Sequence, residues 1–348
     1  MAVKYAAPLA VGSLVALLAT GAAAQTVDGP AVNWNLSTWG KQRAFTKGPE
    51  SVAKYLSDRT GGKFQIKMHY GEALSKDREN LDGIKLGAFQ MAQFCNFYHP
   101  GKNPAWMVFT LPFLPLGDWD IRLAATKAML KHPAFIKDMD QWNAMPYMSG
   151  LLPQYEFMGR GKAPEKLEDW KGLRVRAGGG VGDAMRLLGA VLTTVPATET
   201  FTSLERGTMD AVSLPYTYAH ASYQLHTIST WFTNNMSPGT SECAAVINKD
   251  AYAKLPDQYK KLLEDALPQA YKDQIEAYID IDKVNLPLFK SKMKEVLYSD
   301  AELKRFQEVA GKPVWDKWVA DNKGKFDAQG VLDTLLAEIE KAKAAKKK

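Results

Sequence analysis

Residues 167 to 212 read LEDWKGLRVRAGGGVGDAMRLLGAVLTTVPATETFTSLERGTMDAV. Runs of apolar and β-branched residues alternate here with runs whose apolar residues recur at helical spacing. The predicted strands are GLRVRA (172–177), VLTTV (191–195) and MDAVSL (209–214), and the predicted helices are 181–188 and 198–206. Strand, helix, strand, helix, strand is an order typical of a largely parallel sheet with helices on its faces.

The chain before this segment shows the same order. The predicted strands are 32–38, 64–70 and 88–95, and the predicted helices are 41–60 and 76–86. A proline-rich connection and a helical stretch near 119–143 join this unit to the second one. The sequence therefore predicts two α/β units. Ligands of such sheets bind beyond the carboxyl ends of the strands, so we expect a binding cleft between the units.

Beyond the second unit, the sequence predicts one more strand and a long helix. The strand is CAAVINK (243–249), and the helical pattern runs from Pro256-Asp257 to about Lys292. Pro268 and Pro287 lie inside this pattern, where proline is expected to kink a helix.

Composition describes a folded, mostly soluble protein of 348 residues, 46% of them hydrophobic and 24% charged. The formal net charge of +6 comes from Lys4 and from five lysines after residue 340. The remainder of the chain is close to neutral, which argues against a surface that binds nucleic acid.

The N-terminus has the pattern of a secretory signal. One early lysine is followed by an apolar run from about Leu9 to Ala19 and by small residues at Ala22 and Ala24. An uncleaved membrane anchor is the alternative, but it needs about 20 apolar residues. We therefore expect export and cleavage after Ala24.

The two cysteines, Cys95 and Cys243, are too few for a disulfide scaffold or a structural zinc site. They could form one disulfide or remain two buried thiols, and the sequence leaves both possibilities open because it does not show their separation.

The residue patterns of common enzymes are absent from the sequence. The loop Gly178–Asp183 reads G-x-G-x-x-D and lacks the third glycine of a dinucleotide fingerprint, so no cofactor is expected. Its backbone N–H groups could still bind an anion at a helix start. The five histidines form no zinc-binding H-E-x-x-H pattern, and no serine lies in G-x-S-x-G. We predict neither catalytic nor metal-binding residues.

Arg174 and Arg176 alternate with Val175 and share one face of a strand that ends at the glycine loop. Arginine is rarely buried without a partner, and its planar guanidinium matches a carboxylate. Arg176 lies at the carboxyl end of this strand. The sequence leaves two roles open for it, binding a ligand anion and forming a structural ion pair. For Arg174 we expect a structural role.

The segment 167–212 resembles the signature of the solute-binding proteins of TRAP (tripartite ATP-independent periplasmic) transporters. The family pattern begins D-x-K-G, continues through a helix ending L-G-A, and closes with L-x-x-G-x-x-D. The stretches 59–92, 111–114 and 246–256 extend the resemblance over essentially the whole chain after the signal.

The resemblance implies an α/β protein with the two-lobed periplasmic-binding-protein fold. Each lobe would be an open mixed sheet flanked by helices, and a long helix would bridge the lobes. The expected parts are a signal peptide at 1–24, lobe I at 25–150 and about 243–280, lobe II at 151–242 and about 281–340, and a basic tail at 341–348.

The resemblance also implies a periplasmic receptor that captures an organic carboxylate and delivers it to a membrane permease. Arg176 corresponds to the arginine that clamps the ligand carboxylate. The other candidate ligand-binding residues are Gln154, Tyr155, Leu214, Tyr216, Trp39, Asn96, Tyr98 and Glu242.

Departures from the pattern bear on the ligand. Leu214 stands where sialic-acid binders have an amide, and together with Ala197 it favours an apolar or aromatic monocarboxylate. Relatives that bind 2-oxo acids through a metal carry an acidic residue near there. This chain lacks that acidic residue, so no metal is expected. Glu242 does match a second carboxylate residue of those relatives.

Two other functions remain open at this point. An exported partner of a sensor kinase would have a kinase gene beside its own gene, whereas a transport receptor would have permease genes there. An exported enzyme on the same fold would need a reactive group in the cleft, and the sequence shows none.

Overall fold

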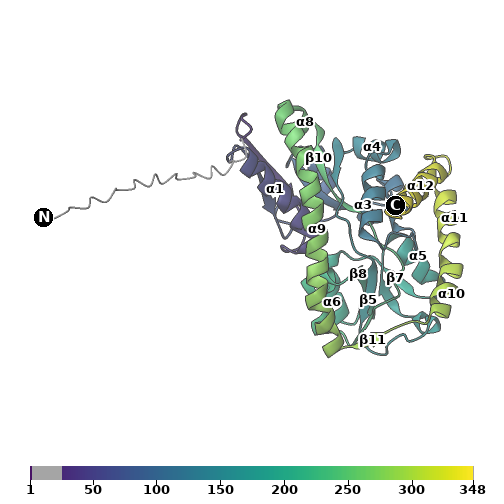
Figure 1. Ribbon diagram of the computed structural model, residues 1–348. Helices are drawn as coiled ribbons and strands as arrows, with labels where there is room; N and C mark the ends of the chain where they lie inside the picture. The colour runs from purple at the N-terminus through teal and green to yellow at the C-terminus, as the bar shows by residue number, and fades with distance from the viewer. Residues whose placement is uncertain (2–25, 348) are drawn as a thin grey trace.

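Two β-sheets, each with helices packed against it, form the two lobes of the protein (Figure 1). The computed structural model describes residue 1 and residues 26–347. The predicted signal peptide and its cleavage site, Met1 apart, lie outside the described residues.

The first sheet has the strand order β2-β1-β3-β10-β4. Its strands are β1 (Val32–Ser37), β2 (Phe64–His69), β3 (Met91–Cys95), β4 (Ala144–Met148) and β10 (Cys243–Asn248). β1 pairs in parallel with β2 and β3, whereas β10 pairs antiparallel with β3 and β4. The sheet is therefore mixed, and it contains the strands predicted for the first unit.

The second sheet has the order β11-β9-β5-β8-β6-β7. Its strands are β5 (Tyr155–Gly159), β6 (Arg174–Arg176), β7 (Val191–Thr193), β8 (Ala211–Pro215), β9 (Trp231–Thr233) and β11 (Lys294–Val296). β6 pairs in parallel with β7 and β8, and β5 pairs antiparallel with β8 and β9. The segment 167–212 thus contributes three adjacent parallel strands, as predicted, and β11 and β9 form another parallel pair at the far edge of the sheet.

Helices cover both sheets. Two helices, α3 (Trp119–Met129) and α4 (Pro133–Asp140), replace the single helical stretch predicted near 119–143. The break occurs because Pro133 cannot continue α3 and instead occupies the first turn of α4. The other helices before residue 256 are α1 (Lys47–Arg59), α2 (Asn80–Lys85), α5 (Gly179–Leu187), α6 (Thr200–Glu205), α7 (Tyr218–Ser222) and α8 (Lys249–Ala253).

The long helix α9 (Asp257–Lys292) has 36 residues and runs past both sheets (Figure 1). It packs against α1 of the first lobe and against α7 and β11 of the second. The predicted bridging helix is therefore confirmed. Pro268 and Pro287, where the sequence predicts kinks, are both exposed, and the helix continues through them.

The C-terminal helices are α10 (Asp300–Ala310), α11 (Lys312–Asp321) and α12 (Ala328–Lys346). α10 packs against α5 of the second lobe, but α12 packs against α3 of the first. Its buried residues Val331, Leu332 and Leu335 join the core around the first sheet. The prediction that about 281–340 lies in lobe II is therefore wrong for the part of α12 up to Ile339, because its apolar stripe is buried against lobe I.

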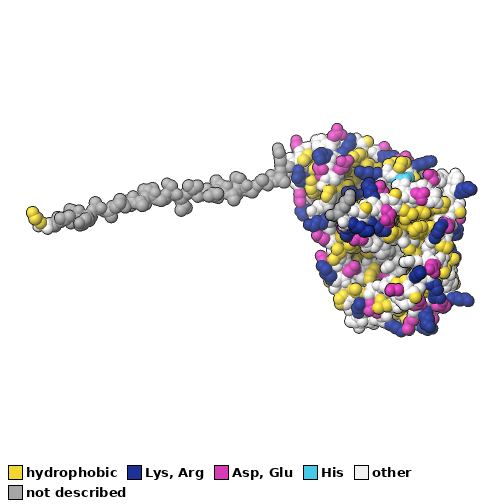
Figure 2. All heavy atoms as spheres, turned by 45° about the vertical axis from the view of Figure 1, so that its right-hand side comes forward, with side chains coloured by type: hydrophobic (Ala, Val, Ile, Leu, Met, Phe, Trp, Pro, Cys, Tyr) yellow, Lys and Arg dark blue, Asp and Glu magenta, His cyan; other side chains and the backbone are white. Residues whose placement is uncertain are grey.

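The surface carries mixed charge. In the face shown in Figure 2, Lys and Arg side chains are interspersed with Asp and Glu. Many of the described lysines pair with acids three or four residues away on one helix, as Lys312 does with Asp316. Among the described helices, none combines the length and the apolar character needed to cross a membrane.

Candidate ligand-binding site

A small cavity of about 30 Å³ lies between the two sheets. Its walls come from the adjacent ends of β3, β5, β6, β8 and β10 and from loops and short helices that follow β1, β3, β7 and β8. The two-unit topology predicts a site in this position. Predicted residues in the wall are Trp39, Tyr98, Tyr155, Arg176 and Leu214, together with Ala197, the residue used to predict the ligand class.

Arg176 is the most buried charge in the cavity wall, with an exposed fraction of 1%. It is the last residue of β6, which places its guanidinium over the cavity. Its Nε donates to the carbonyl oxygen of Val195 at 3.0 Å, and Nη1 donates to that of Ser213 at 2.8 Å. Nη2 is buried without a hydrogen-bond partner, and no carboxylate of the described residues forms an ion pair with Arg176.

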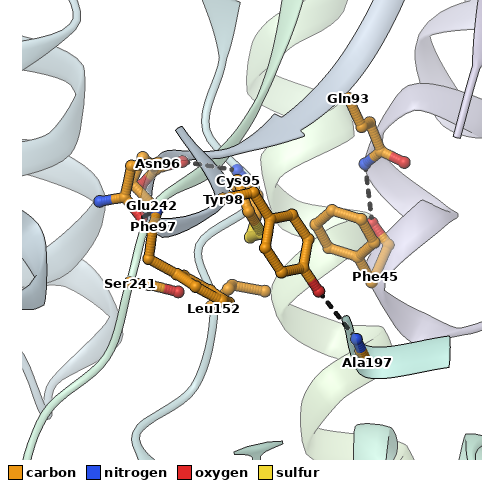
Figure 3. The surroundings of a disulfide bond; sticks show 12 residues. Phe45, Gln93, Cys95, Asn96, Phe97, Tyr98, Leu152, Ala197, Ser241 and Glu242 are labelled. Atoms are coloured by element: carbon orange, nitrogen blue, oxygen red, sulfur yellow. Dashed lines mark hydrogen bonds between the residues drawn. A yellow bond between two sulfur atoms is a disulfide. The ribbon is translucent and has the colours of Figure 1, made fainter. Parts of the chain in front are cut away.

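Aromatic rings make up much of the remaining wall. The ring of Phe97 lies 5.4 Å from Arg176 Cζ, and Trp39 contacts Tyr98 edge-on with their centroids 5.9 Å apart. Tyr98 Oη accepts a hydrogen bond from the backbone N–H of Ala197 at 3.0 Å, which joins the two lobes across the cavity (Figure 3). Burial raises the pKa of Tyr155 to about 12, so this hydroxyl is neutral. The wall thus offers flat apolar surfaces around one buried cation.

A disulfide between Cys95 and Cys243 forms part of the cavity wall (Figure 3). The two residues lie directly opposite each other on β3 and β10. Of the two possibilities that the sequence leaves open, the structure therefore shows the pair.

A second arginine, Arg43, also lines the cavity. Its Nη1 donates to the carbonyl oxygens of Trp39 and Lys41, at 2.7 Å each, and its Cζ lies 4.9 Å from the ring of Phe45. Arg43 was not predicted as a site residue. Arg176 was identified because it lies at the carboxyl end of a predicted strand, and Arg43 stands in the loop that follows the carboxyl end of β1, with aromatic residues on both sides of it in the sequence.

Residues 37–322 match the family described as bacterial extracellular solute-binding protein, family 7 (DctP). The chain belongs to this family. The match confirms the resemblance on which the two-lobed fold and the interlobe site were predicted.

Solved structures of TRAP solute-binding proteins share this fold. One from a marine metagenome, specific for aromatic acid ligands and solved with 3-hydroxybenzoate, has a TM-score of 0.79 at 17% identity over 90% of this chain and 99% of that chain. Another, from Rhodoferax ferrireducens and solved with copurified benzoate, has a TM-score of 0.78 at 20% identity, with coverage of 90% and 99%. A monocarboxylate 2-oxoacid-binding periplasmic protein of Nostoc sp. is 24% identical over 335 residues, 90% of each chain.

In this solute-binding protein, four of the predicted ligand-binding residues lie outside the cavity wall. Asn96 donates to the carbonyl oxygen of Trp106 at 2.8 Å, and Tyr216 donates to Asn234 Oδ1 at 2.6 Å. The side-chain amide of Gln154 lies between the carbonyl oxygen of Gly239 and the guanidinium of Arg122. These three side chains make structural contacts because their polar atoms point into the lobes.

Glu242 is the fourth. Ser149 Oγ donates to its Oε2 at 2.8 Å, and the backbone N–H of Gly150 donates to its Oε1 at 3.1 Å. Burial raises the pKa of Glu242 to about 7. The carboxyl group therefore links two segments that connect the lobes. One runs from the end of β4 at residue 148 to the start of β5 at residue 155, and the other runs from the end of β9 at residue 233 to the start of β10 at residue 243.

The glycine loop does not present a free anion site. Gly180 N–H donates to Thr110 Oγ1 at 3.0 Å, and a Cβ at Gly180 would lie 2.5 Å from the Thr110 carbonyl oxygen. Gly178 similarly lies against the ring of Phe97. The glycines are needed because the first lobe approaches the start of α5 at backbone distance.

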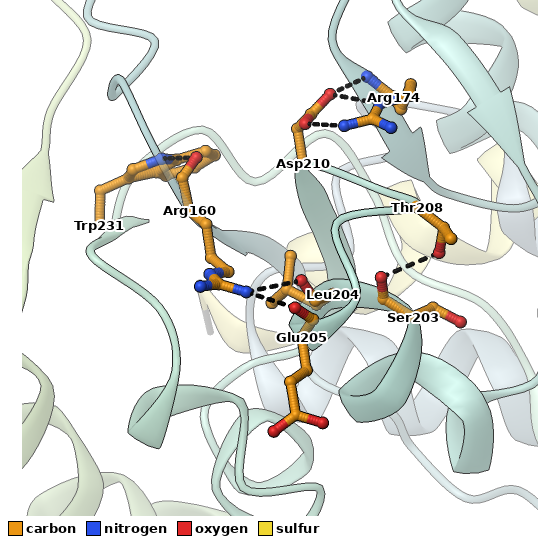
Figure 4. Close-up of polar contacts among 8 residues, drawn as sticks. All are labelled: Arg160, Arg174, Ser203, Leu204, Glu205, Thr208, Asp210 and Trp231. Atoms are coloured by element: carbon orange, nitrogen blue, oxygen red, sulfur yellow. Dashed lines mark hydrogen bonds and ion pairs between the residues drawn. The ribbon is translucent and has the colours of Figure 1, made fainter.

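Arg174 has the structural role predicted for it. Its guanidinium forms two hydrogen bonds to Asp210, at 3.0 and 2.6 Å, on the exposed edge of the second lobe (Figure 4). Among the described residues, no group of three or more His, Cys, Asp or Glu side chains is arranged to hold a metal ion.

Proposed function

We propose that this protein is the periplasmic receptor of a TRAP transporter and that it captures an apolar or aromatic monocarboxylate in the interlobe cavity. The observation that carries the proposal is Arg176, a buried cation with one N–H group unpartnered and no acid beside it. Burying an unpaired charge costs several kcal/mol, so such a group is retained where an anion completes it.

The wall around Arg176 supports the choice of an organic acid. Phe97, Tyr98 and Tyr155 offer aromatic surface next to the guanidinium, and Leu214 offers aliphatic surface. A carboxylate would pair with Arg176 while the body of the ligand contacts these rings. The solved relatives that carry benzoate and 3-hydroxybenzoate are consistent with this class.

Capture requires the lobes to open. A cavity of about 30 Å³ takes water molecules, whereas sites for organic ligands usually exceed about 300 Å³. Contacts between the lobes close the cavity here, including the hydrogen bond between Tyr98 and Ala197 and the packing of Thr110 on Gly180. We infer that the ligand enters an open form and that these contacts form around it.

Thermal shift measurements on refolded protein test the ligand class. At 100 times its dissociation constant, a ligand adds about 2.7 kcal/mol of apparent stability. Benzoate and related acids should raise the melting temperature, and benzamide and methyl benzoate should not. A shift with neutral sugars or amines and none with any acid would contradict the proposal.

Export and delivery need separate tests. For protein secreted by a Gram-negative host, the intact mass should correspond to a chain beginning at Gln25. Retention of residues 1–24 in a membrane fraction would contradict the cleavage. For delivery, uptake of a labelled acid by cells should require both this protein and the permease encoded near it. Uptake that is unchanged without this protein would contradict a transport role.

A further inference from the structure

The cavity wall contains unpartnered hydrogen-bonding groups besides that of Arg176. Besides Arg176 Nη2, the buried Nε of Arg43 and the buried hydroxyl of Tyr223 have no hydrogen-bond partner among the described residues. All three residues line the cavity. Leaving a buried polar group unsatisfied costs about 1–3 kcal/mol, so their coincidence in one cavity requires an explanation.

Arg43 and Tyr223 meet at one place. A Cβ built on Gly40 would lie 2.8 Å from Arg43 Nη1 and 3.0 Å from Tyr223 Oη, so both groups border Gly40. The Arg43 guanidinium also lies 5.9 Å from the centroid of the Tyr223 ring. Arg43 belongs to the first lobe, and Tyr223 follows α7 of the second. Together they form a polar pair that joins the lobes, which we call the Arg43–Tyr223 end of the cavity.

Arg43 and Arg176 have different contacts in the cavity wall. Arg176 contacts Phe97 and the carbonyl oxygens of Val195 and Ser213, whereas Arg43 contacts Trp39, Phe45 and Tyr223. Within its own lobe, the guanidinium of Arg43 is held by two carbonyl oxygens and lies beside the rings of Trp39 and Phe45, so its position does not depend on the second lobe.

The charged residues of the cavity wall are also unbalanced. Among the described residues, the cavity wall carries two arginines and no aspartate or glutamate. The acid nearest in sequence, Glu50, accepts hydrogen bonds from Gln42, Thr46 and Tyr70 instead. A single carboxylate at Arg176 would leave the half-buried Arg43 without an acid in the cavity wall.

We propose that the ligand carries a second oxygen acceptor, placed on its body away from the carboxylate, and that Arg43 and Tyr223 bind this oxygen. The inference rests on the proposed function, because it assumes that the carboxylate pairs with Arg176. The second oxygen belongs to a hydroxyl group or to a second carboxylate. Both accept hydrogen bonds from Arg43 Nε and Tyr223 Oη, and only the carboxylate also neutralises Arg43.

Calorimetric titration with benzoate, 3-hydroxybenzoate and isophthalate tests the inference. In the wild-type protein, at least one of the two substituted acids should bind about tenfold or more tightly than benzoate. Arg43→Gln should remove this advantage, so that the substituted acids bind this variant no more tightly than benzoate does. A preference for isophthalate that Arg43→Gln removes identifies a second carboxylate, and a preference for 3-hydroxybenzoate that Tyr223→Phe reduces identifies a hydroxyl.

Arg160→Gln is the matched control. Arg160 Nη1 also donates to two carbonyl oxygens, those of Leu204 and Glu205, but it lies outside the cavity (Figure 4). The advantage of the substituted acids should therefore survive in this variant. Tyr223→Phe removes only one hydroxyl and keeps the test valid if Arg43→Gln does not fold.

Two results overturn the inference: equal binding of all three acids by the wild-type protein, or an advantage that persists in both Arg43→Gln and Tyr223→Phe. The proposed function fails differently, through the absence of binding by every acid or through benzoate binding that Arg176→Gln leaves unchanged.

Discussion

Replacing Arg176 by alanine should weaken the binding of an organic acid by roughly 30-fold to several thousand-fold. The ligand carboxylate and the guanidinium would be desolvated together in the closed cavity, where the arginine is only 1% exposed. Truncating one partner of such a pair leaves the other buried and unpaired, at a loss of about 2–5 kcal/mol. At about 1.4 kcal/mol for each factor of ten, this loss corresponds to the stated range.

The same substitution should lower folding stability, and the structure shows why. Alanine leaves the carbonyl oxygens of Val195 and Ser213 without the donors they have now. Each buried group left unsatisfied costs about 1–3 kcal/mol. Arg176→Lys should recover part of both losses, because an ammonium group can reach an oxygen but cannot form the planar two-pronged contact.

Isothermal calorimetry measures the affinities, at a temperature where circular dichroism shows each variant folded. Arg174→Ala is the control on the same strand, because it removes an exposed ion pair to Asp210 outside the cavity. Its affinity should equal that of the wild-type protein. Binding by Arg176→Ala within about threefold of wild type would refute the reasoning and return Arg176 to a purely structural role.

Three further predictions concern stability and closure. Because burial raises the pKa of Glu242 to about 7, above its value of 4.5 in the unfolded chain, its protonation stabilises the fold below pH 4.5 and this contribution is lost as the pH rises through 7. Urea unfolding at pH 5 and pH 8 should show the loss, and Glu242→Gln should reduce it. Reducing the disulfide between Cys95 and Cys243, which are 148 residues apart, should cost about 2–5 kcal/mol, measured by urea unfolding with and without dithiothreitol. Gly180→Ala should weaken ligand binding at least tenfold, since its Cβ would lie 2.5 Å from a backbone carbonyl oxygen of the first lobe, whereas Gly101→Ala, with open space around it, should bind normally. Equal stability at pH 5 and pH 8 would contradict the prediction for Glu242, and equal stability with and without dithiothreitol would contradict the prediction for the disulfide. An unchanged ligand affinity of Gly180→Ala would contradict the prediction for closure.

The sequence by itself determined the strands of the two β-α-β-α-β units and β10, but not β4, β5, β9 and β11, and it determined the end of the sheets at which the candidate ligand site lies. Strand and helix are local properties, because alternation every two residues or apolar spacing near 3.6 is readable within one short segment. The place of Arg176 beside the cleft could be predicted for the same reason, whereas its role toward a carboxylate was implied only by the family resemblance. It stands at the end of a predicted strand, and the position of a strand end relative to the cleft follows from the α/β order alone.

Other features depended on the tertiary structure. Only there do Arg43 and Tyr223, which are far apart in the sequence, meet at Gly40, and only there do Cys95 and Cys243 pair across two strands. The tertiary structure also decided in which direction each predicted site residue points its side chain. Gln154 and Glu242 stand near the cleft in sequence but bond to Arg122, Ser149 and Gly150 inside the protein. The physical reason is that local periodicity is set by neighbouring residues, whereas a contact between distant segments depends on how the whole chain packs.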